Sequence, residues 1–381
     1  MVLRDGHFLK IRGKGVLVID KGPDYRNRLK GLRREIVRKG VDGLLVTDIN
    51  NIRYLTGFTG SSGYVVVTRN KALLFTDTRY TVQAKLETAP SGFTVRIYKQ
   101  KPLEVLAARV GGFNLRRLGF EGDVLSYNLY KKIKSALKPL RFSPITNPVA
   151  GVRAVKDPFE VDLIKKSSAI LKSGFKKVER TLKAGLTEAG VALCAEEWMR
   201  KKGAEGVAFE TIVASGQRGA LPHGKASEKR IKKGELVVVD MGARFEGYNS
   251  DNTRTYCIGK ANGLQEKIYG VVKEAQKRAI ALITDGVAAV DVDGAARSHI
   301  KKAGYGKYFG HGTGHGVGLD VHERPSIGPA SKDVFKEGMV VTVEPGIYIP
   351  GWGGVRIEDM ALVKKDGCEL MTASPDELVC L

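Results

Sequence analysis

Short apolar runs separated by glycine-rich or polar turns fill the first third of the chain. Apolar runs bounded by turn residues predict strands at residues 16–19, 43–46, 64–68, 72–75 and 94–97. Apolar positions three or four residues apart predict helices over 24–40, 103–110 and 127–137, the last with Ser126 as its N-cap. Residues 51–63, with three glycines, are predicted to form a loop, and Pro144 and Pro148 mark a linker. This mixture predicts a first α/β domain that ends near residue 145.

A different arrangement, repeated twice, follows the linker. Helical periodicity covers residues 158–182 and 187–203, and again 264–284 and 293–303. The first helix pair precedes a predicted strand at 209–214 and a strand–turn–strand segment at 235–256, and the second pair precedes another such segment at 339–358. Two copies are too few for a solenoid. The pattern therefore predicts a duplicated helix–helix–hairpin unit, with helices covering the hairpins.

Acidic residues occupy matching positions in the two predicted hairpins. Folding the first hairpin about residues 245–246 sets Asp240 opposite Asp251. Folding the second about its central glycine sets Glu344 opposite Glu358. Opposed side chains on one face of a hairpin lie about 5 Å apart, and two carboxylates that close repel unless a cation lies between them. A lone carboxylate in a strand usually lies at the surface, but two opposed pairs are much less expected by chance, so the pattern favours a metal site.

Three of the six histidines, His311, His315 and His322, lie in one glycine-rich segment between the hairpins. Four carboxylates and one imidazole would suit Mn²⁺, Fe²⁺, Co²⁺ or Zn²⁺, with too few sulfur or nitrogen ligands for a structural zinc site. Four carboxylates match two ions better than one, and a two-ion site can activate a bridging water and polarise a carbonyl. The pattern thus indicates hydrolysis, with a carboxylate as general base and spare histidines to stabilise the oxyanion or donate a proton.

Composition narrows the class of protein. The 381 residues suffice for about two domains, and no apolar run is long enough to span a membrane. The first residues lack the apolar core of a signal peptide, so a cytoplasmic location is expected. Four scattered cysteines predict free thiols. The net charge of +22 has two interpretations, a solvated basic surface, which we favour, or affinity for nucleic acid.

Five motifs in the second half together resemble the pita-bread metallopeptidases, the family of methionine aminopeptidase, aminopeptidase P and prolidase. They are Val239-Asp-Met-Gly-Ala, Asn249-Ser-Asp-Asn-Thr-Arg-Thr, His311-Gly-Thr-Gly-His-Gly-Val-Gly, Val343-Glu-Pro-Gly-Ile-Tyr and Gly354-Val-Arg-Ile-Glu-Asp. The Tyr54-Leu-Thr-Gly-Phe-Thr-Gly segment resembles the creatinase-type N-terminal domain of the Xaa-Pro branch. The resemblance implies an N-terminal extension (1–22) to which we assign no role, a creatinase-type mixed α/β domain (23–148) and a pita-bread catalytic domain (155–381).

The resemblance also assigns residues by their position in the motifs. The implied ligands of two divalent ions, Mn²⁺ first, are Asp240, Asp251, His315, Glu344 and Glu358. Glu344 would also be the general base. The implied catalytic and substrate-binding residues are His223, His311, His322, Arg356 and Tyr348.

The implied reaction is hydrolysis of the bond between an N-terminal residue and a following proline, through a water that bridges two metal ions. We lean slightly to an Xaa-Pro dipeptidase, in which Arg324 would clamp the proline carboxylate. The alternatives are aminopeptidase P, which acts on longer peptides, and a non-catalytic binding module for nucleic acid or protein. A homodimer is expected, and neither a membrane nor a nucleic acid is expected as a partner.

Overall fold

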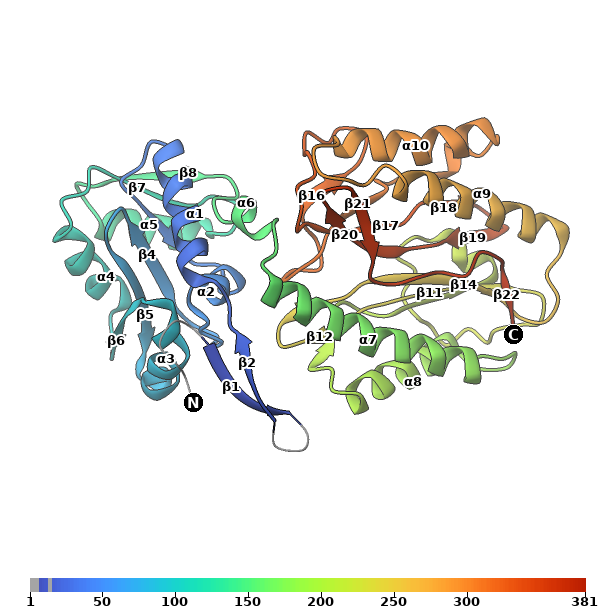
Figure 1. The fold of residues 1–381 in the computed structure, drawn as a ribbon, viewed down its shortest axis with the longest axis horizontal. Coiled ribbons are helices and arrows are strands. Elements are labelled where there is room, and N and C mark those ends of the chain that lie inside the picture. Colours follow the sequence, from blue (N-terminus) through green and yellow to red (C-terminus); the bar gives the residue numbers. More distant parts are fainter. Residues whose placement is uncertain (1–6, 13–15) are drawn as a thin grey trace. The chain divides into compact units, whose positions relative to one another are not determined.

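The computed structural model describes residues 7–12 and 16–381, and the chain divides into two compact units, residues 1–153 and 154–381 (Figure 1). Part of the segment 1–22, to which the sequence assigned no role, therefore lies outside the described residues. Its described parts are strands β1 (His7–Arg12) and β2 (Val16–Lys21), which pair antiparallel. The strand predicted at residues 16–19 is confirmed within β2.

A six-stranded mixed sheet forms the centre of the first unit. Its strands, in spatial order, are β6 (Thr94–Tyr98), β5 (Ala72–Asp77), β4 (Tyr64–Thr68), β3 (Gly43–Val46), β7 (Arg117–Glu121) and β8 (Arg141–Ile145). The four strands predicted for this region are confirmed. Strands β7 and β8 were not predicted, and Pro144, expected in a linker, lies within β8.

Helices flank this sheet (Figure 1). They are α1 (Tyr25–Arg38), α2 (Ile49–Thr56), α3 (Thr81–Thr88), α4 (Pro102–Gly111), α5 (Tyr127–Ala136) and α6 (Ala150–Arg153). Ser126 caps α5 as predicted, since its side chain accepts a hydrogen bond from the Leu129 amide. The loop prediction for residues 51–63 is wrong in its first half, because Asp48 caps a helix that continues to Gly57 in the left-handed conformation.

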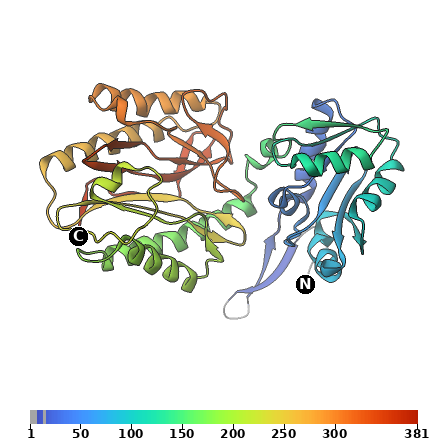
Figure 2. The same ribbon diagram turned by 180° about the vertical axis from the view of Figure 1, so that it is seen from behind.

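Two helix pairs lie on opposite sides of the strands in the second unit (Figure 2). The pairs are α7 (Pro158–Thr181) with α8 (Glu188–Lys201), and α9 (Gly263–Ile280) with α10 (Ala289–Lys302). Asp157 and Glu160 form a capping box that fixes the start of α7. No helix among the described residues has both the length and the apolar content to cross a bilayer.

The strands of this unit form two main sheets and two small ones. The first main sheet contains β10 (Ile212–Ser215), β11 (Leu236–Met241), β14 (Asn252–Cys257) and β22 (Val379–Cys380). The second contains β16 (Glu323–Ile327), β15 (Gly314–Gly316), β17 (Val340–Val343), β20 (Asp359–Lys364) and β21 (Gly367–Leu370). The small sheets are β13 (Tyr248–Asn249), β12 (Ala243–Phe245) and β9 (Gly206–Val207), and β18 (Gly346–Ile349) with β19 (Gly353–Arg356).

Each helix pair buries its apolar face against one half of these strands. Phe175 of α7 and Met199 of α8 share a core with Val239 of β11. Val272 of α9 shares a second core with Val341 of β17. The duplicated helix–helix–hairpin architecture predicted from the sequence is therefore confirmed, with the hairpins between the helix pairs.

The two hairpins differ in how well their register was predicted. In the second, Gly346 pairs with Arg356, which is the expected register. In the first, Asp240 pairs with Thr253 rather than with Asp251, so that expectation is wrong by two residues. The turn lies one residue later than assumed, because Glu246 and Gly247 have φ of 45° and 78°, as a two-residue type I′ turn requires.

Candidate metal centre

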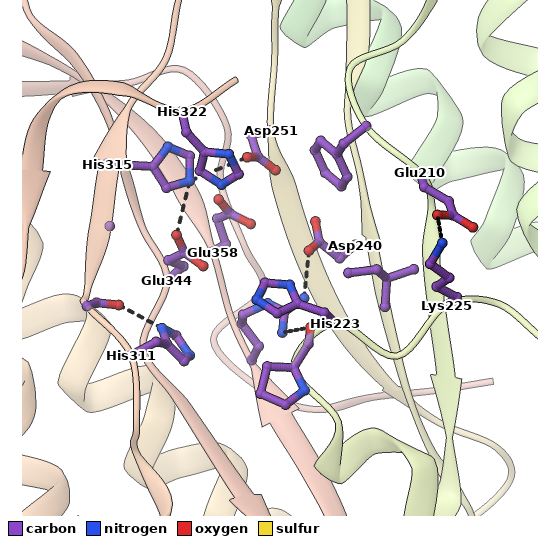
Figure 3. A pocket seen from close by; sticks show the side chains of 16 residues that line it. Glu210, His223, Lys225, Asp240, Asp251, His311, His315, His322, Glu344 and Glu358 are labelled. Carbon is purple, nitrogen blue, oxygen red and sulfur yellow. Dashed lines mark hydrogen bonds and ion pairs between the residues drawn. The ribbon is translucent and has the colours of Figure 1, made fainter. Parts of the chain in front are cut away.

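A cavity of about 410 Å³ lies among the ends of the two hairpins and the histidine segment (Figure 3). Its walls come from segments far apart in the sequence. The lining residues are Phe209, Glu210, Ile212, Pro222, His223, Lys225, Asp240, Asp251, His311, Gly312, Gly314, His315, His322, Glu344, Arg356 and Glu358. The five residues expected to bind metal thus all line one cavity, together with the three histidines expected at the substrate site.

Carboxylate and imidazole groups converge on one side of this cavity (Figure 3). One ligand atom from each of Asp251, His315 and Glu358 lies within 4.8 Å of the other two. His315 Nε2 lies 3.2 Å from Glu344 Oε1 and 3.7 Å from Asp251 Oδ2. These groups are close enough to share one or two small cations.

Two of the carboxylates have one oxygen held by the protein and the other left without a partner. Arg356 Nη2 donates to Asp240 Oδ2 at 2.6 Å, and Thr253 Oγ1 donates to Glu358 Oε2 at 2.7 Å. Within the described residues, the buried Asp240 Oδ1 and Glu358 Oε1 have no hydrogen-bond partner. Buried polar oxygens are nearly always satisfied. A pair of orphaned carboxylate oxygens on this cavity is the arrangement that a bound cation would complete.

The His315 ring is held so that one nitrogen faces the carboxylates. Its Nδ1 lies 3.1 Å from the Gly316 carbonyl, which can only accept, so Nδ1 carries the proton. With a cation bound, Nε2 would be unprotonated and would present its lone pair on the side of Asp251 and Glu344. A backbone acceptor that fixes the tautomer in this way is typical of a metal-binding histidine.

Without a cation, the cluster shifts the pKa values of its own members. Burial, and then the neighbouring Asp240, raise the pKa of Asp251 well above its usual range. Burial, and then Asp251, do the same to the pKa of Glu358. Burial is the largest influence and works against the charged form of His315, but the hydrogen bond from its ring to Glu344 and the charges of Glu344 and Asp251 together outweigh it and raise the pKa of His315 to about 9. Acidic groups that hold their protons this strongly indicate a site with an excess of negative charge.

The donor set and the orphaned oxygens fit divalent metal ions. Oxygen and imidazole ligands suit Mn²⁺, Co²⁺, Fe²⁺ or Zn²⁺, and four carboxylates, of which Asp240, Asp251 and Glu358 are buried, supply enough charge for two ions. Asp240, Asp251, His315, Glu344 and Glu358 are the residues that would hold them.

A hydrogen-bonded chain supports the opposite wall. Arg356 Nη1 donates to the Tyr348 hydroxyl at 3.0 Å, and that hydroxyl lies 2.9 Å from His311 Nε2. His311 Nδ1 lies 2.7 Å from the Gly312 carbonyl, so Nδ1–H donates there and Nε2 accepts from Tyr348. Burial lowers the pKa of His311, which agrees with a neutral ring. Arg356 therefore joins Asp240 to His311 across the site.

His223 and His322 remain as histidines with side chains in the cavity (Figure 3). The ring centroids of His322 and His315 lie 4.3 Å apart. Burial, and then the neighbouring His315, lower the pKa of His322. His322 is therefore a neutral ring next to the carboxylate cluster. One of its two nitrogens can donate a hydrogen bond and the other can accept one.

Arg324 lies elsewhere than the sequence suggested. It is not among the residues that line the cavity, and its guanidinium is hydrogen-bonded to Asp333. The cation at the mouth of the cavity is instead Lys225, whose ammonium lies 2.6 Å from Glu210 Oε2 (Figure 3). Neither Lys225 nor Glu210 was expected at the site from the sequence, although Lys225 follows His223 by only two residues.

The sequence analysis also missed the threonines that hold the carboxylates. Thr253 binds Glu358, and the Thr342 hydroxyl lies 3.3 Å from Glu344 Oε1 and accepts from the His315 amide at 3.0 Å. Both lie in strands next to an expected ligand. Their proximity in the chain could have suggested them.

The comparisons with known proteins agree with this geometry. Residues 162–365 match the model of metallopeptidase family M24, and residues 28–155 match that of the creatinase/prolidase N-terminal domain. An Xaa-Pro dipeptidase of Pyrococcus horikoshii is 38% identical over 90% of this chain and 95% of its own.

Two solved structures cover both units. An Xaa-Pro dipeptidase from Bacillus anthracis matches 94% of this chain and 100% of its own, with 39% identity and a TM-score of 0.91. An X-Pro aminopeptidase from Thermotoga maritima matches 91% of this chain and 100% of its own, with 40% identity and a TM-score of 0.83. The match to the family model over residues 162–365 covers more than half of the sequence, so the chain belongs to metallopeptidase family M24.

Proposed function

We propose that this chain hydrolyses Xaa-Pro dipeptides at a site that holds two divalent ions, Mn²⁺ in the first instance. The observation that carries the proposal is the buried cluster of Asp240, Asp251, His315, Glu344 and Glu358, with two carboxylate oxygens that lack a partner among the described residues. The names of the relatives from Pyrococcus horikoshii and Bacillus anthracis support the substrate class.

Bound divalent ions would supply Lewis-acid activation of the scissile carbonyl and of the attacking water. Glu344 is the proposed general base, since its carboxylate lies at the cavity wall and can take a proton from that water. His322 is proposed to donate a hydrogen bond to the developing oxyanion, because its ring lines the cavity beside that of His315 and its lowered pKa favours the neutral form. His223, on the same cavity, is proposed to deliver a proton to the leaving proline nitrogen.

The Xaa-Pro bond is a tertiary amide without an N–H. A site that cleaves this bond therefore needs no hydrogen-bond acceptor for an amide N–H. It must instead hold the carbonyl and the two ends of the dipeptide. The chain of hydrogen bonds from Arg356 through Tyr348 to His311 is proposed to keep the His311 ring in one orientation against the substrate.

We propose Lys225, and not Arg324, as the partner of the proline carboxylate. Lys225 lines the mouth of the cavity, and its backbone forms a β-bridge with Ile212. Its ion pair with Glu210 is solvent-exposed, with side-chain exposures of 74% and 62%. Such a pair contributes about 0–1 kcal/mol, so a substrate carboxylate can compete for the ammonium at little cost.

The test is hydrolysis of Ala-Pro beside Ala-Pro-Ala-Ala, with Mn²⁺ and after chelation. Metal-dependent cleavage of the dipeptide alone is expected. Preference for the tetrapeptide would instead make the chain an aminopeptidase P, the alternative supported by the name of the Thermotoga maritima structure. Failure to cleave either peptide with metal bound would refute both.

Two expectations about the whole protein stay proposals. A homodimer would be tested by light scattering of the purified chain, and a cytoplasmic location by fractionation of the source cells. The division into a creatinase-type domain (23–148) and a catalytic domain (155–381) is proposed on the two family matches, and limited proteolysis would test it.

A further inference from the structure

The positive charge of the chain is concentrated in one unit. Residues 1–153 contain 29 Lys and Arg against 11 Asp and Glu, a net charge of +18. Residues 154–381 contain 34 against 30, a net charge of only +4. The unit without the carboxylate cluster therefore carries most of the total of +22. A general need for solubility does not explain so uneven a distribution.

Helix α1 presents a row of these cations to solvent. Arg26, Lys30, Arg34 and Arg38 follow one another at four-residue intervals, so they lie along one side of the helix, and all four are exposed. At about 1.5 Å per residue the row is about 18 Å long. The opposite side of the helix is buried through residues such as Leu32. Like charges at this spacing repel, so an anion along the row would relieve an unfavourable arrangement.

The row borders a surface hollow of about 620 Å³. Its lining residues are Arg26, Lys30, Arg33, Arg34, Val37, Arg38 and Arg69. Arg69, in the turn between β4 and β5, brings a further cation from outside the helix. Arg33 Nε donates to the Thr68 carbonyl at 3.1 Å, which holds its guanidinium beside that turn.

Few acidic groups neutralise this hollow, which we call the α1 basic hollow. No carboxylate is among its described lining residues. Glu35 pairs with Arg38 at 2.6 Å. In the part of the chain that the structure describes, Lys30 and Arg34 take part in no ion pair, so their charges are available to an external anion. Arg69 also forms no ion pair within 4 Å, but its charge lowers the pKa of Asp42.

The composition of the hollow identifies the anion. Five of its six cations are arginines, which bind phosphate through two parallel hydrogen bonds. Its single apolar residue, Val37, is too small an anchor for a bilayer surface, where Trp, Phe and Leu are used. It has no aromatic ring on which unpaired bases could stack. We propose that the α1 basic hollow binds the phosphate backbone of double-stranded nucleic acid without sequence preference.

This inference is independent of the proposed peptidase function. It reverses the expectation that the positive charge forms only a solvated surface and that nucleic acid is not a partner. Duplex DNA carries one charge per about 1.7 Å of its axis, so a row of about 18 Å runs beside a length of duplex that carries about ten phosphates, part of which face the protein. Contacts to phosphates give affinity that falls steeply with salt and does not depend on base sequence.

The test is fluorescence anisotropy of a labelled duplex of about 20 base pairs with the full-length protein, over about 50–200 mM salt. The double variant K30E/R34E removes two cations from the row. The matched control K301E/K302E makes the same change in net charge on the exposed end of α10 in the other unit. Denaturation curves and Ala-Pro hydrolysis establish that both variants fold.

The patch variant is expected to bind the duplex at least about tenfold more weakly than the control, with the slope of log K against log salt smaller by about 2. Equal loss in both variants would overturn the proposal, because binding would then follow net charge alone. The proposal would also be overturned if the wild type did not bind the duplex at low salt. Tighter binding to anionic vesicles, or to a single strand, than to the duplex would overturn it as well. If K30E/R34E does not fold, R69E tests the same hollow from the turn.

Discussion

Replacing Asp251 with Asn removes one negative charge from the cluster without changing the size of the side chain. The ligand atoms of Asp251 and Glu358 lie within 4.8 Å of each other. Two full charges at that separation repel by about 3 kcal/mol at an effective dielectric constant near 20. Partial protonation and the nearby His315 reduce this repulsion, so we expect the metal-free variant to be about 1–2 kcal/mol more stable than the metal-free wild type.

Metal should reverse this order. An ion at about one hundred times its Kd stabilises the wild type by about 2.7 kcal/mol. For a unit of this size, 1 kcal/mol corresponds to about 2–4 °C, so the Tm of the wild type should rise by about 5–10 °C. The amide of Asn offers one neutral oxygen in place of a charged carboxylate, and the variant should gain little. We therefore expect the variant to have the higher Tm without metal and the wild type to have the higher Tm with Mn²⁺.

The pH dependence has a defined sign. Burial, and then Asp240, raise the pKa of Asp251, so the folded metal-free protein retains a proton that the unfolded chain releases near its ordinary pKa of about 3.9. The stability of the wild type therefore falls as pH rises from that value through the raised pKa. Asn cannot titrate, so the advantage of the variant should grow over the same range.

Differential scanning calorimetry in chelator and in Mn²⁺ measures both effects, and Ala-Pro hydrolysis should be lost in the variant. Asp366→Asn is the matched control, because Asp366 is an exposed turn residue between β20 and β21 where Asn is equally suited. A D251N protein that melts below the wild type in chelator, or that keeps the full metal-induced rise in Tm, would refute the charge-cluster reasoning.

Three further changes test the rest of the site. Lys225→Ala should raise KM for Ala-Pro about fivefold with little change in kcat, since an exposed charge pair contributes about 1 kcal/mol. Arg324→Ala should leave KM unchanged. Steady-state kinetics measures both, and the opposite result would restore Arg324 as the clamp. Thr253→Val should weaken metal binding about 10–100-fold by freeing Glu358, which isothermal titration calorimetry measures. Tyr348→Phe should lower kcat and destabilise the fold by about 1–3 kcal/mol, because two buried groups lose their shared partner; urea unfolding without a shift would contradict this.

Strands with a continuous apolar or β-branched run were easier to predict than strands whose apolar residues are interrupted. Strands β3, β4 and β5 follow one another as antiparallel neighbours and were predicted. Strand β6 pairs in parallel and follows a helix, yet it was predicted from its β-branched residues. Strands β7 and β8 were missed because neither contains a continuous apolar or β-branched run. Pro144 argued further against β8, yet β8 is at the edge of the sheet, where proline is tolerated.

The substrate end of the site was harder to predict than the metal end. Ligand residues occur in compact motifs, so the sequence alone brought the four carboxylates and the histidine segment together. The positions of Arg324 and Lys225 depend on how strand β16 and the segment that bridges to Ile212 run relative to the cavity, and neither spacing nor charge reveals that. The bond from Arg356 to Asp240 spans 116 positions in the chain and required the assembled hairpins.

The register predicted for the first hairpin was wrong, yet it still placed both of its carboxylates on the face that lines the site. Side chains alternate between the two faces of a strand, so a register error of one residue would have moved one carboxylate of a pair to the opposite face. The error in the first hairpin was two residues, since Asp240 pairs with Thr253 and not with Asp251. An even error preserves the face, and both carboxylates still line the cavity. A prediction of which side chains share a face is therefore more robust than a prediction of which are directly opposed, and a metal cluster requires only the shared face.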